Sequence, residues 1–313
     1  MIQAIEELKK EISKVMVGME QELDLLMIAL LQGGHILMES VPGTGKTLLA
    51  KTFANCLSAD FKRIQFTPDV LPGDVTGIQF FNPKTQEFQL RKGPILTNIL
   101  LADEINRATP RTQSSLLEAM EERQVTIDGE TLILEEPFMV IATQNPVESL
   151  QGTFALPAAQ LDRFFMKLTI GYPSLKEESE ILKRFRNGNP SASVRKVMDK
   201  HELYTIREEM KKIQIHEDIE KYILMIIRET REHPSIMNGA SPRASLALLK
   251  ASEGLAFING RSFVTPADVK SAVPFCLSHR LQLSIEASLM MTPESVLEEI
   301  LSKVPVPVET EVS

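Results

Sequence analysis

A glycine-rich stretch ending in lysine and threonine is the pattern in this sequence that points most directly to chemistry. It reads SVPGTGKT, from Ser40 to Thr47, and matches the phosphate-binding pattern G-x-x-x-x-G-K-[ST] except that Ser40 replaces the first glycine. Glycines let backbone N–H groups turn toward phosphate oxygens, and a helix beginning here adds its positive end. Lys46 would reach the β- and γ-phosphates of ATP, and Thr47 would bind Mg²⁺. The predicted nucleotide-binding residues of this loop are Pro42, Gly43, Thr44, Gly45, Lys46, Thr47 and Leu48.

Two neighbouring acids supply the second half of such a site. They end the apolar segment NILLADE, which runs from Asn98 to Glu104. An acidic pair at the end of a buried strand is costly without a cation or polar partners. Asp103 would hold the Mg²⁺, and Glu104 would orient the attacking water and act as its general base. The alternative is that both acids are simply exposed at a strand end.

A polar residue after the next apolar segment belongs to the same hypothesis. Asn145 lies in ATQNP, and ligands of open α/β sheets bind at the carboxyl ends of the strands. Its amide would position the water or contact the γ-phosphate. Alternatively, it caps a turn before Pro146.

These residues need strands and helices that place them together. Apolar runs bounded by polar residues predict strands over 35–38, 62–66, 99–102, 138–143 and 164–170. Helical periodicity predicts helices over 2–15, 20–32 and 46–57, and one that starts at Pro110 with Thr109 as its N-cap. The alternation of the two predicts an α/β domain over 1–171 with a mostly parallel sheet.

Two other parts of this domain and the second half of the chain have different patterns. Residues 68–94 are rich in Pro, Gly and Asn and indicate an insertion, and Asp128-Gly129 within 124–134 predicts a hairpin. After residue 171 most segments are helical in pattern, which predicts a second domain over 172–304 and a flexible tail over 305–313. The helices expected there cover 176–187, 200–212, 215–233, 241–259 and 265–273.

Composition disfavours several classes of function. The 313 residues carry a net charge of -8, so a general attraction to nucleic acid is not expected. Cys56 and Cys276 are the only cysteines and lie far apart, which favours reduced thiols in a cytoplasmic protein. The start of the chain lacks the apolar core of a signal peptide, and the apolar run over 25–31 is too short to span a bilayer. We therefore expect no stable membrane insertion.

Several motifs together resemble one family. GGHILMESVPGTGKT, ILLADEINRATPRTQSSLLEAMEE, ATQNPVE, LPAAQLDRFFMKL and GASPRA, between Gly33 and Ala244, look like motifs of the MoxR family of AAA+ ATPases. The resemblance implies a P-loop core with a central, mostly parallel five-stranded sheet, followed by a small all-helical lid domain. It also implies that the 71–90 insert is the family's helix-2 insert and that the 124–134 hairpin is its pre-sensor-1 hairpin.

The resemblance assigns roles to individual residues. Asn145 matches the sensor-1 position, Arg163 looks like the arginine finger that reaches a neighbouring subunit's ATP, and Arg243 looks like sensor 2 in the lid. Val17 and Gly18 resemble the segment that packs on adenine, where Met19 follows instead of the family's usual glutamine.

Physical arguments leave alternatives for the arginines. Arg243 follows a plausible N-cap, Ser241, and a cation in a first turn opposes the helix dipole by a few tenths of a kcal/mol, which an anionic ligand would relieve. It could instead be an exposed, screened arginine. Arg163 could form a surface ion pair with Asp162. Arg107 and Arg111, just after the acidic pair, could lie at a subunit interface or form structural salt bridges.

The family resemblance implies what the protein does. It indicates binding and hydrolysis of Mg-ATP at the interfaces of a hexameric ring, to ADP and phosphate, with chaperone-like work on client protein complexes. A von Willebrand factor A domain protein and metal-cofactor insertion are the partner and process that the resemblance suggests. A conformational switch with negligible hydrolysis is the alternative. A nucleic-acid motor is disfavoured, because the predicted hairpin carries Asp128 and Glu130.

Overall fold

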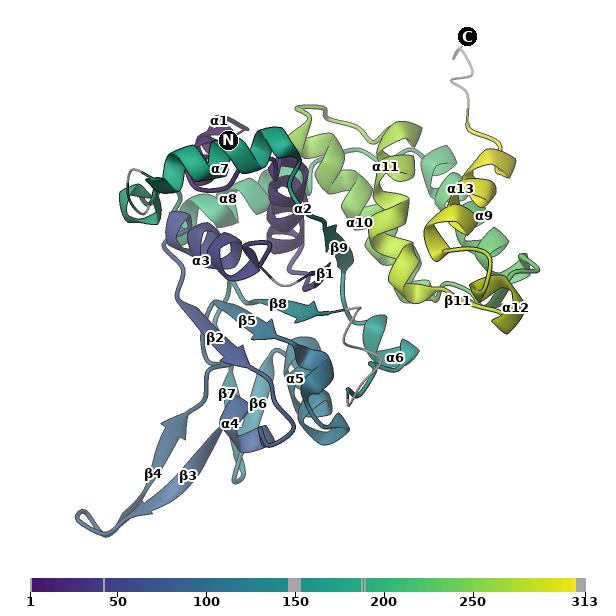
Figure 1. Cartoon of the computed structure of the whole chain (residues 1–313). Helices are drawn as coiled ribbons and strands as arrows, with labels where there is room; N and C mark the ends of the chain where they lie inside the picture. Colours follow the sequence, from purple (N-terminus) through teal and green to yellow (C-terminus); the bar gives the residue numbers. More distant parts are fainter. Residues whose placement is uncertain (1, 42, 146–152, 187, 189, 308–313) are drawn as a thin grey trace.

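Five parallel strands form the sheet that positions the predicted site. In the computed structural model of the chain, the described residues are 2–41, 43–145, 153–186, 188 and 190–307 (Figure 1). The strand order is β2-β5-β8-β1-β9, and each neighbouring pair is parallel. The strands are β1 (Ile36–Ser40), β2 (Phe61–Gln65), β5 (Ile99–Asp103), β8 (Met139–Gln144) and β9 (Met166–Ile170). The predicted five-stranded sheet is confirmed and is parallel throughout.

Alternate residues of each central strand enter two separate hydrophobic cores. Ile36 and Met38 face one core, and Leu37 faces the other. The first core holds α1 (Ile2–Ile12), α2 (Glu20–Leu31) and α3 (Lys46–Cys56), and the second holds α5 (Pro110–Glu122). The sheet is therefore covered on both faces (Figure 1), as its near-continuous apolar strands require.

Pro110 is the first residue of α5, as predicted, and Thr109 precedes it in an extended conformation. The Thr109 side chain makes no capping hydrogen bond, however. Instead, the Thr109 hydroxyl forms a hydrogen bond with the Thr112 hydroxyl, with the two Oγ1 atoms 3.2 Å apart.

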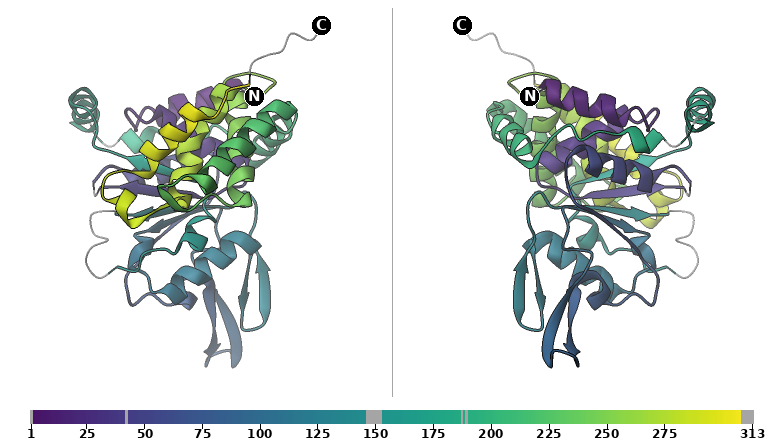
Figure 2. Two further views of the ribbon diagram at one scale, coloured as in Figure 1. Left: turned by 90° about the vertical axis from the view of Figure 1, so that its right-hand side faces the viewer. Right: turned by 90° about the vertical axis from the view of Figure 1, so that its left-hand side faces the viewer.

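Two hairpins project from the sheet on the same side of the molecule (Figure 2). The first, β3 (Gly77–Asn82) and β4 (Glu87–Lys92), follows a short helix, α4 (Pro72–Thr76). The second, β6 (Gln124–Ile127) and β7 (Glu130–Ile133), turns at Asp128 and Gly129, whose φ angles of 48° and 89° are those of the predicted two-residue turn. The Gln79 N–H donates to Asp128 Oδ2 at 3.3 Å, which links the two hairpins.

Helices dominate the second half of the chain, as predicted. The main ones are α7 (Leu175–Arg186), α8 (Lys200–Met210), α9 (Glu217–Glu232), α10 (Pro242–Ile258), α11 (Pro266–Leu277) and α13 (Pro293–Lys303). Shorter elements are α6 (Ala158–Leu161), α12 (Ile285–Ser288) and the antiparallel strands β10 (Ile236–Asn238) and β11 (Gln282–Leu283). Buried side chains of α8 to α11 and α13 belong to the same core as α1, α2 and α3.

One predicted boundary in this half is wrong. The helix expected over 265–273 continues to Leu277, through Pro274. Proline removes a helical hydrogen bond and usually ends a helix. Here Cys276 and Leu277 lie beyond it and are both fully buried, so packing outweighs the lost bond.

Two expectations from composition can be compared with the structure. Cys56 and Cys276 are both free and buried. Among the described residues, none of the helices combines the length and the apolar composition needed to cross a membrane.

Candidate functional site

The phosphate-binding loop joins β1 to α3 as predicted. Gly43 and Gly45 have φ angles of 85° and 86°, which favour glycine over residues with a side chain. Gly45 is the N-cap of α3, and this helix start has no side-chain capping bond. Its N–H groups are therefore available for an anion. Lys46 Nζ donates to the Ser40 carbonyl at 3.4 Å, and Pro42 lies outside the described residues.

Asp103 lies at the carboxyl end of β5 and is 7% exposed. Its Oδ2 accepts hydrogen bonds from Arg63 Nε at 3.1 Å and from an Nη of Arg63 at 2.6 Å. Its Oδ1 accepts from Thr143 Oγ1 at 2.6 Å. The acid is therefore not simply exposed at a strand end: it is buried and held by a cation and a hydroxyl.

Glu104 is held by a different set of partners. Its φ of 57° turns the chain out of the strand, and its N–H donates to Thr143 Oγ1 at 2.9 Å. Its Oε2 accepts from Gln65 Nε2 at 2.7 Å and pairs with Arg107 Nε at 3.1 Å. For Arg107, the structure thus shows the salt bridge considered from the sequence.

The order of the strands places Asn145 near both halves of the predicted site. It directly follows β8, which lies between β5 and β1 in the sheet. It therefore follows the strand that lies between those of the acidic pair and the phosphate-binding loop, and it is 4% exposed. The residues after it, 146–152, lie outside the described part of the chain.

The donor set fits a magnesium nucleotide. Thr47 and Asp103 offer the hard oxygen ligands that Mg²⁺ prefers. Asp103 ends β5, and Thr47 lies in the first turn of α3, which follows β1, so both lie beyond the carboxyl ends of the strands. The Ser40 hydroxyl at the end of β1 is buried with no protein partner among the described residues. The loop glycines leave the space for phosphates: a Cβ built on Gly43 would have no neighbour within 4 Å.

A cavity of about 350 Å³ beside the phosphate-binding loop could receive the adenine base of ATP. Val17 and Gly18 line it together with the loop, so the structure brings the predicted adenine segment to the phosphate-binding loop. Gly18 has a φ of 70°, and a Cβ there would lie 2.0 Å from Glu177 Oε1. The other residues of its wall include Met19, Leu48, Ile170, Ile181 and Phe185. These apolar side chains suit the faces of a purine.

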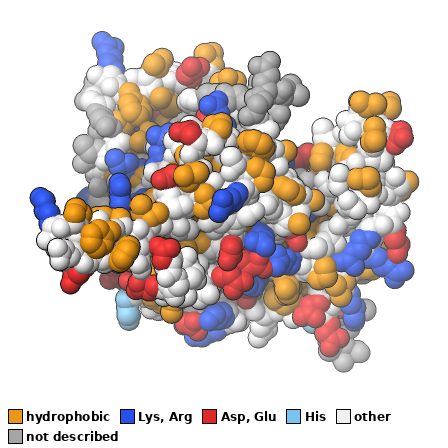
Figure 3. All heavy atoms as spheres, turned by 90° about the horizontal axis from the view of Figure 1, so that it is seen from below, with side chains coloured by type: hydrophobic (Ala, Val, Ile, Leu, Met, Phe, Trp, Pro, Cys, Tyr) orange, Lys and Arg blue, Asp and Glu red, His pale blue; other side chains and the backbone are white. Residues whose placement is uncertain are grey.

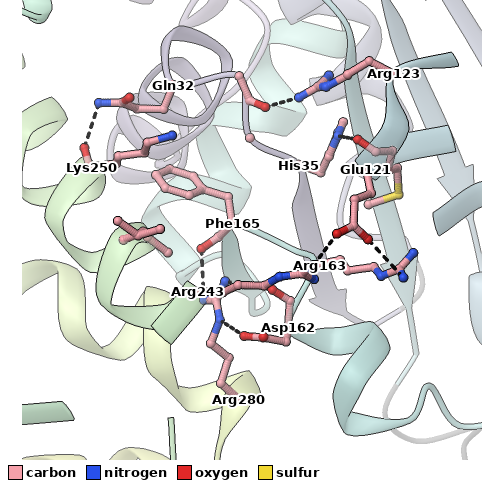
Figure 4. Close-up of a pocket in the computed structure, with 15 residues that line it drawn as sticks. Gln32, His35, Glu121, Arg123, Asp162, Arg163, Phe165, Arg243, Lys250 and Arg280 are labelled. Carbon is pink, nitrogen blue, oxygen red and sulfur yellow. Dashed lines mark hydrogen bonds and ion pairs between the residues drawn. The ribbon is translucent and has the colours of Figure 1, made fainter. Parts of the chain in front are cut away.

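Arg163 and Arg243 lie at the amino ends of the strands, opposite the carboxyl ends where the phosphate-binding loop lies. Arg163 precedes β9, whose first residue pairs with Ile36 of β1 and whose last pairs with Ser40 at the phosphate-binding loop. A strand of this length separates its ends by about 13 Å. Arg163 Nη2 lies 3.0 Å from Glu121 Oε2, and Arg243 pairs with the other oxygen of Glu121 (Figure 4).

This arrangement decides the alternative that the sequence left open for Arg163. The suggested pair of Arg163 with Asp162 is wrong, because Asp162 Oδ1 accepts from Arg280 Nε at 2.8 Å and Arg163 pairs with Glu121. Ser241 is the N-cap of α10 as predicted, and its hydroxyl accepts from the Ala244 N–H. The anion beside Arg243 at this helix start is Glu121.

Positive charge predominates in the cavity around these arginines, which has a volume of about 290 Å³ (Figure 4). Its charged lining residues are the cations Arg123, Arg163, Arg243, Lys250 and Arg280 and the acids Glu121 and Asp162. Five cations against two acids leave an excess of three positive charges. Such a cavity suits an anion.

Sequence reasoning missed three polar residues that hold the predicted ones. Arg63 and Gln65 alternate along β2, so both side chains can face the neighbouring acids of β5. The sequence signal was two polar residues at positions i and i+2 of a predicted strand. Glu121 had only the acidic end of LLEAMEE as a signal.

Comparisons with known proteins find family models and relatives that cover most of the chain. The model of the ATPase family associated with various cellular activities (AAA) matches residues 35–166, and the AAA lid domain model matches residues 228–300. The uncharacterized protein YeaC of Bacillus subtilis is 48% identical over 96% of this chain and 94% of its own length. Chaperone MoxR1 of Mycobacterium tuberculosis is 40% identical over 95% of this chain and 81% of its own length. The crystal structure of a candidate ATPase from Cytophaga hutchinsonii, 41% identical, superposes with a TM-score of 0.92 over 98% of this chain and 96% of that one.

Proposed function

Since the chain belongs to the MoxR family of AAA+ ATPases, we propose that it hydrolyses Mg-ATP at the boundary between two copies of itself. One observation carries this proposal: the phosphate-binding loop lies at the carboxyl ends of the strands, and the arginine pair lies at their amino ends. Within a single copy, these two cations are therefore too far from the nucleotide site to act there. They would need the nucleotide of a second copy.

Residues of one copy bind the substrate and activate water. The N–H groups at the start of α3 and the Lys46 ammonium bind the phosphates. Magnesium held by Thr47 and Asp103 would neutralise charge between the β- and γ-phosphates. Glu104 exchanges its bond from Gln65 for one from the attacking water and takes its proton, and Asn145 fixes the position of that water.

Residues of the second copy complete the charge balance. Arg163 and Arg243, already side by side on Glu121, present two guanidinium groups to the γ-phosphate. An arginine supplied in trans raises phosphoryl-transfer rates by about 10³- to 10⁵-fold. Sensor 2 was expected to act from the lid, and we now assign Arg243 to the neighbour's nucleotide together with Arg163.

The projecting hairpins are the parts that would act on a client protein complex. Phe80, Phe81 and Phe88 of β3 and β4 are 41%, 52% and 71% exposed, and hydrophobic side chains gather on this projection (Figure 3, left). Exposed apolar clusters of this kind mark interaction sites. Chaperone work, as the name of the Mycobacterium tuberculosis relative suggests, is the function we propose for them. A hexameric ring, a von Willebrand factor A domain partner, metal-cofactor insertion and a cytoplasmic location stay predictions.

The test is to mix two inactive variants. Arg163→Ala removes the donated cation, and Lys46→Ala removes the phosphate contact. Each alone should release phosphate at least about a hundredfold more slowly than the unaltered protein, since both cations act on the transferred group. In the mixture, the intact loop of the Arg163→Ala copy can meet the intact arginine pair of the Lys46→Ala copy. Part of the activity should therefore return.

The control is Arg163→Ala mixed with Arg163→Ala/Lys46→Ala, in which sound arginines are missing from every boundary. Recovery in that control, or none in the first mixture despite joint assembly, would rule out action in trans. A switch without hydrolysis predicts no phosphate release above that of Lys46→Ala from any sample.

A further inference from the structure

One carboxylate holds both arginines that the proposed reaction needs. The two oxygens of Glu121 are divided between them: Oε2 lies 3.0 Å from Nη2 of Arg163, and Oε1 pairs with Nη2 of Arg243. The side chains of Glu121 and Arg163 are each 32% exposed and that of Arg243 is 52% exposed, so solvent partly screens this cluster. Arg163 comes from the core and Arg243 from α10, and their separation along the chain is 80 residues. Glu121 therefore fixes the distance between two cations from different elements.

The helix end that carries Glu121 is itself held on the sheet. Met120, the residue before it, accepts a hydrogen bond from the buried His35 ring at 3.1 Å. Arg123, two residues after it, donates to the Phe138 carbonyl at 2.6 Å and to the Gly33 carbonyl. Burial lowers the pKa of His35 to about 3, so this ring is neutral and keeps its hydrogen bonds at ordinary pH. These hydrogen bonds restrict the movement of the helix end that carries Glu121.

The other acid of the cavity is already engaged. Asp162 accepts from Arg280 Nε at 2.8 Å and from the Ser241 hydroxyl at 2.8 Å. Ser241 is the N-cap of α10, so these bonds tie the start of that helix to the core beside Arg163. Arg243 is thereby brought to Glu121, and Glu121 is the acid left to pair with both arginines.

The pairing leaves most of each guanidinium group available. An arginine side chain has five N–H donors, and each of these two uses one nitrogen, Nη2, on Glu121. We propose that Glu121 is a positioning residue for the reaction of the neighbouring copy: it holds Arg163 and Arg243 as a pair whose remaining donors bind the γ-phosphate together. This inference rests on the proposed function, because it needs both arginines to act on a second copy's nucleotide.

The test compares Glu121→Gln with Glu122→Gln. The first change would keep the shape of the side chain but offer one acceptor oxygen and turn an NH₂ group toward the second guanidinium. Glu122 is exposed on the same helix, so its replacement is a matched loss of one charge. For Glu121→Gln we expect kcat for phosphate release to fall about a hundredfold, as for groups misplaced by about 1 Å. The KM for ATP should stay within about twofold, since the variant's own loop is intact, and Glu122→Gln should match the unaltered protein in both constants.

Two further measurements separate positioning from a general structural defect. Mixing Glu121→Gln with Lys46→Ala should restore activity, because the Lys46→Ala copy supplies a properly held pair. The double variant Arg163→Ala/Glu121→Gln should be no slower than Arg163→Ala alone, since both changes disable one unit. A kcat for Glu121→Gln equal to that of Glu122→Gln, or a defect that the mixture does not repair, would overturn the inference.

The outcome also tells this inference apart from the proposed function. If Arg163→Ala is slow and Glu121→Gln is not, the trans reaction stands and the role of Glu121 is wrong. If Arg163→Ala keeps full activity, the proposed function fails and the positioning role fails with it. Urea denaturation of both glutamine variants shows whether either change unfolds the protein.

Discussion

Arg63 is the residue that makes the buried carboxylate of Asp103 tolerable in the absence of a metal ion. Its guanidinium donates twice to one carboxylate oxygen, and a buried acid without such a partner pays its full desolvation cost. Asp103 is also the acid that would hold a magnesium ion in the proposed reaction. In that reaction, Mg²⁺ would take the place of Arg63 as the cation beside this carboxylate.

Replacing Arg63 should reveal that exchange. We expect Arg63→Ala to lower the free energy of unfolding by roughly 2 kcal/mol without nucleotide, the usual value of hydrogen bonds to a charged group on a half-exposed partner. The loss should shrink when Mg-ATP is bound, since Mg²⁺ restores a cation. Thermal unfolding in the Glu104→Gln background, with and without Mg-ATP, measures both. Arg91→Ala, an exposed arginine on β4, is the control and should change neither value.

His35 predicts how stability depends on pH. Its pKa is lowered from 6.5 to about 3, first by burial and then by the nearby charge of Arg123. Because the folded pKa is below the unfolded one, the contribution of this ring is complete above about pH 6.5 and is lost as pH falls toward 3. Between pH 7 and pH 5 the share of the loss that comes from this ring should be about 2 kcal/mol. Urea denaturation should show a smaller loss for His35→Gln, while His201→Gln, an exposed histidine, should behave as the unaltered protein.

Local spacing was enough to predict the loop and the acidic pair, because each is defined by neighbours in the sequence. Arg63, Gln65 and Glu121 could not be predicted in the same way. Their partners lie 40, 39 and 42 or more residues away in the chain, and only the folded sheet brings them together.

At the scale of elements, α10 lies closer to α2 than ordinary side chains allow. Gly254 faces Ile28, and a Cβ on this glycine would lie 2.5 Å from Cγ2 of that fully buried residue. Ile28 is β-branched and has little rotamer freedom to yield. This close contact fixes the helix that carries Arg243.

Gly254→Ala should therefore destabilise the protein, although alanine in a helix normally gains about 1 kcal/mol over glycine. Overpacking should cost about 1–3 kcal/mol, and a displaced α10 should lower kcat through Arg243. Chemical denaturation and phosphate release check the two effects. A variant more stable than the original protein would show that α2 and α10 can separate without cost.

The elements with a strong local signal matched the sequence analysis, for physical reasons visible in particular residues. Asp128-Gly129 fits a turn that needs two positive φ angles, and the structure has them. The end of α11 could not be predicted from Pro274, because the local rule for proline is opposed by burial of the residues after it. Burial of that kind depends on α9, α10 and α13, which pack on α11 from elsewhere in the chain.

At the scale of the whole molecule, the proposed function requires two copies for each complete site. The phosphate release rate per subunit should therefore rise with protein concentration and level off when assembly is complete. The rise should occur at higher concentration in high salt if charge contributes to the contact. A rate per subunit that is independent of concentration, in samples shown to be monomeric, would contradict a shared site.

The position of the loop and the arginine pair on opposite edges also fixes a count. Under the proposed trans reaction, an open row of copies has one fewer boundary than it has members, so one terminal copy would hold ATP that it cannot cleave and the other would hold arginines with nothing to contact. Adding copies to an open row never supplies the missing boundary. Joining the two ends into a ring supplies it, for any number of copies that the geometry permits. Closure would thus supply one more working site without any additional chain, and a copy whose arginine pair is damaged would inactivate its neighbour's nucleotide site instead of its own.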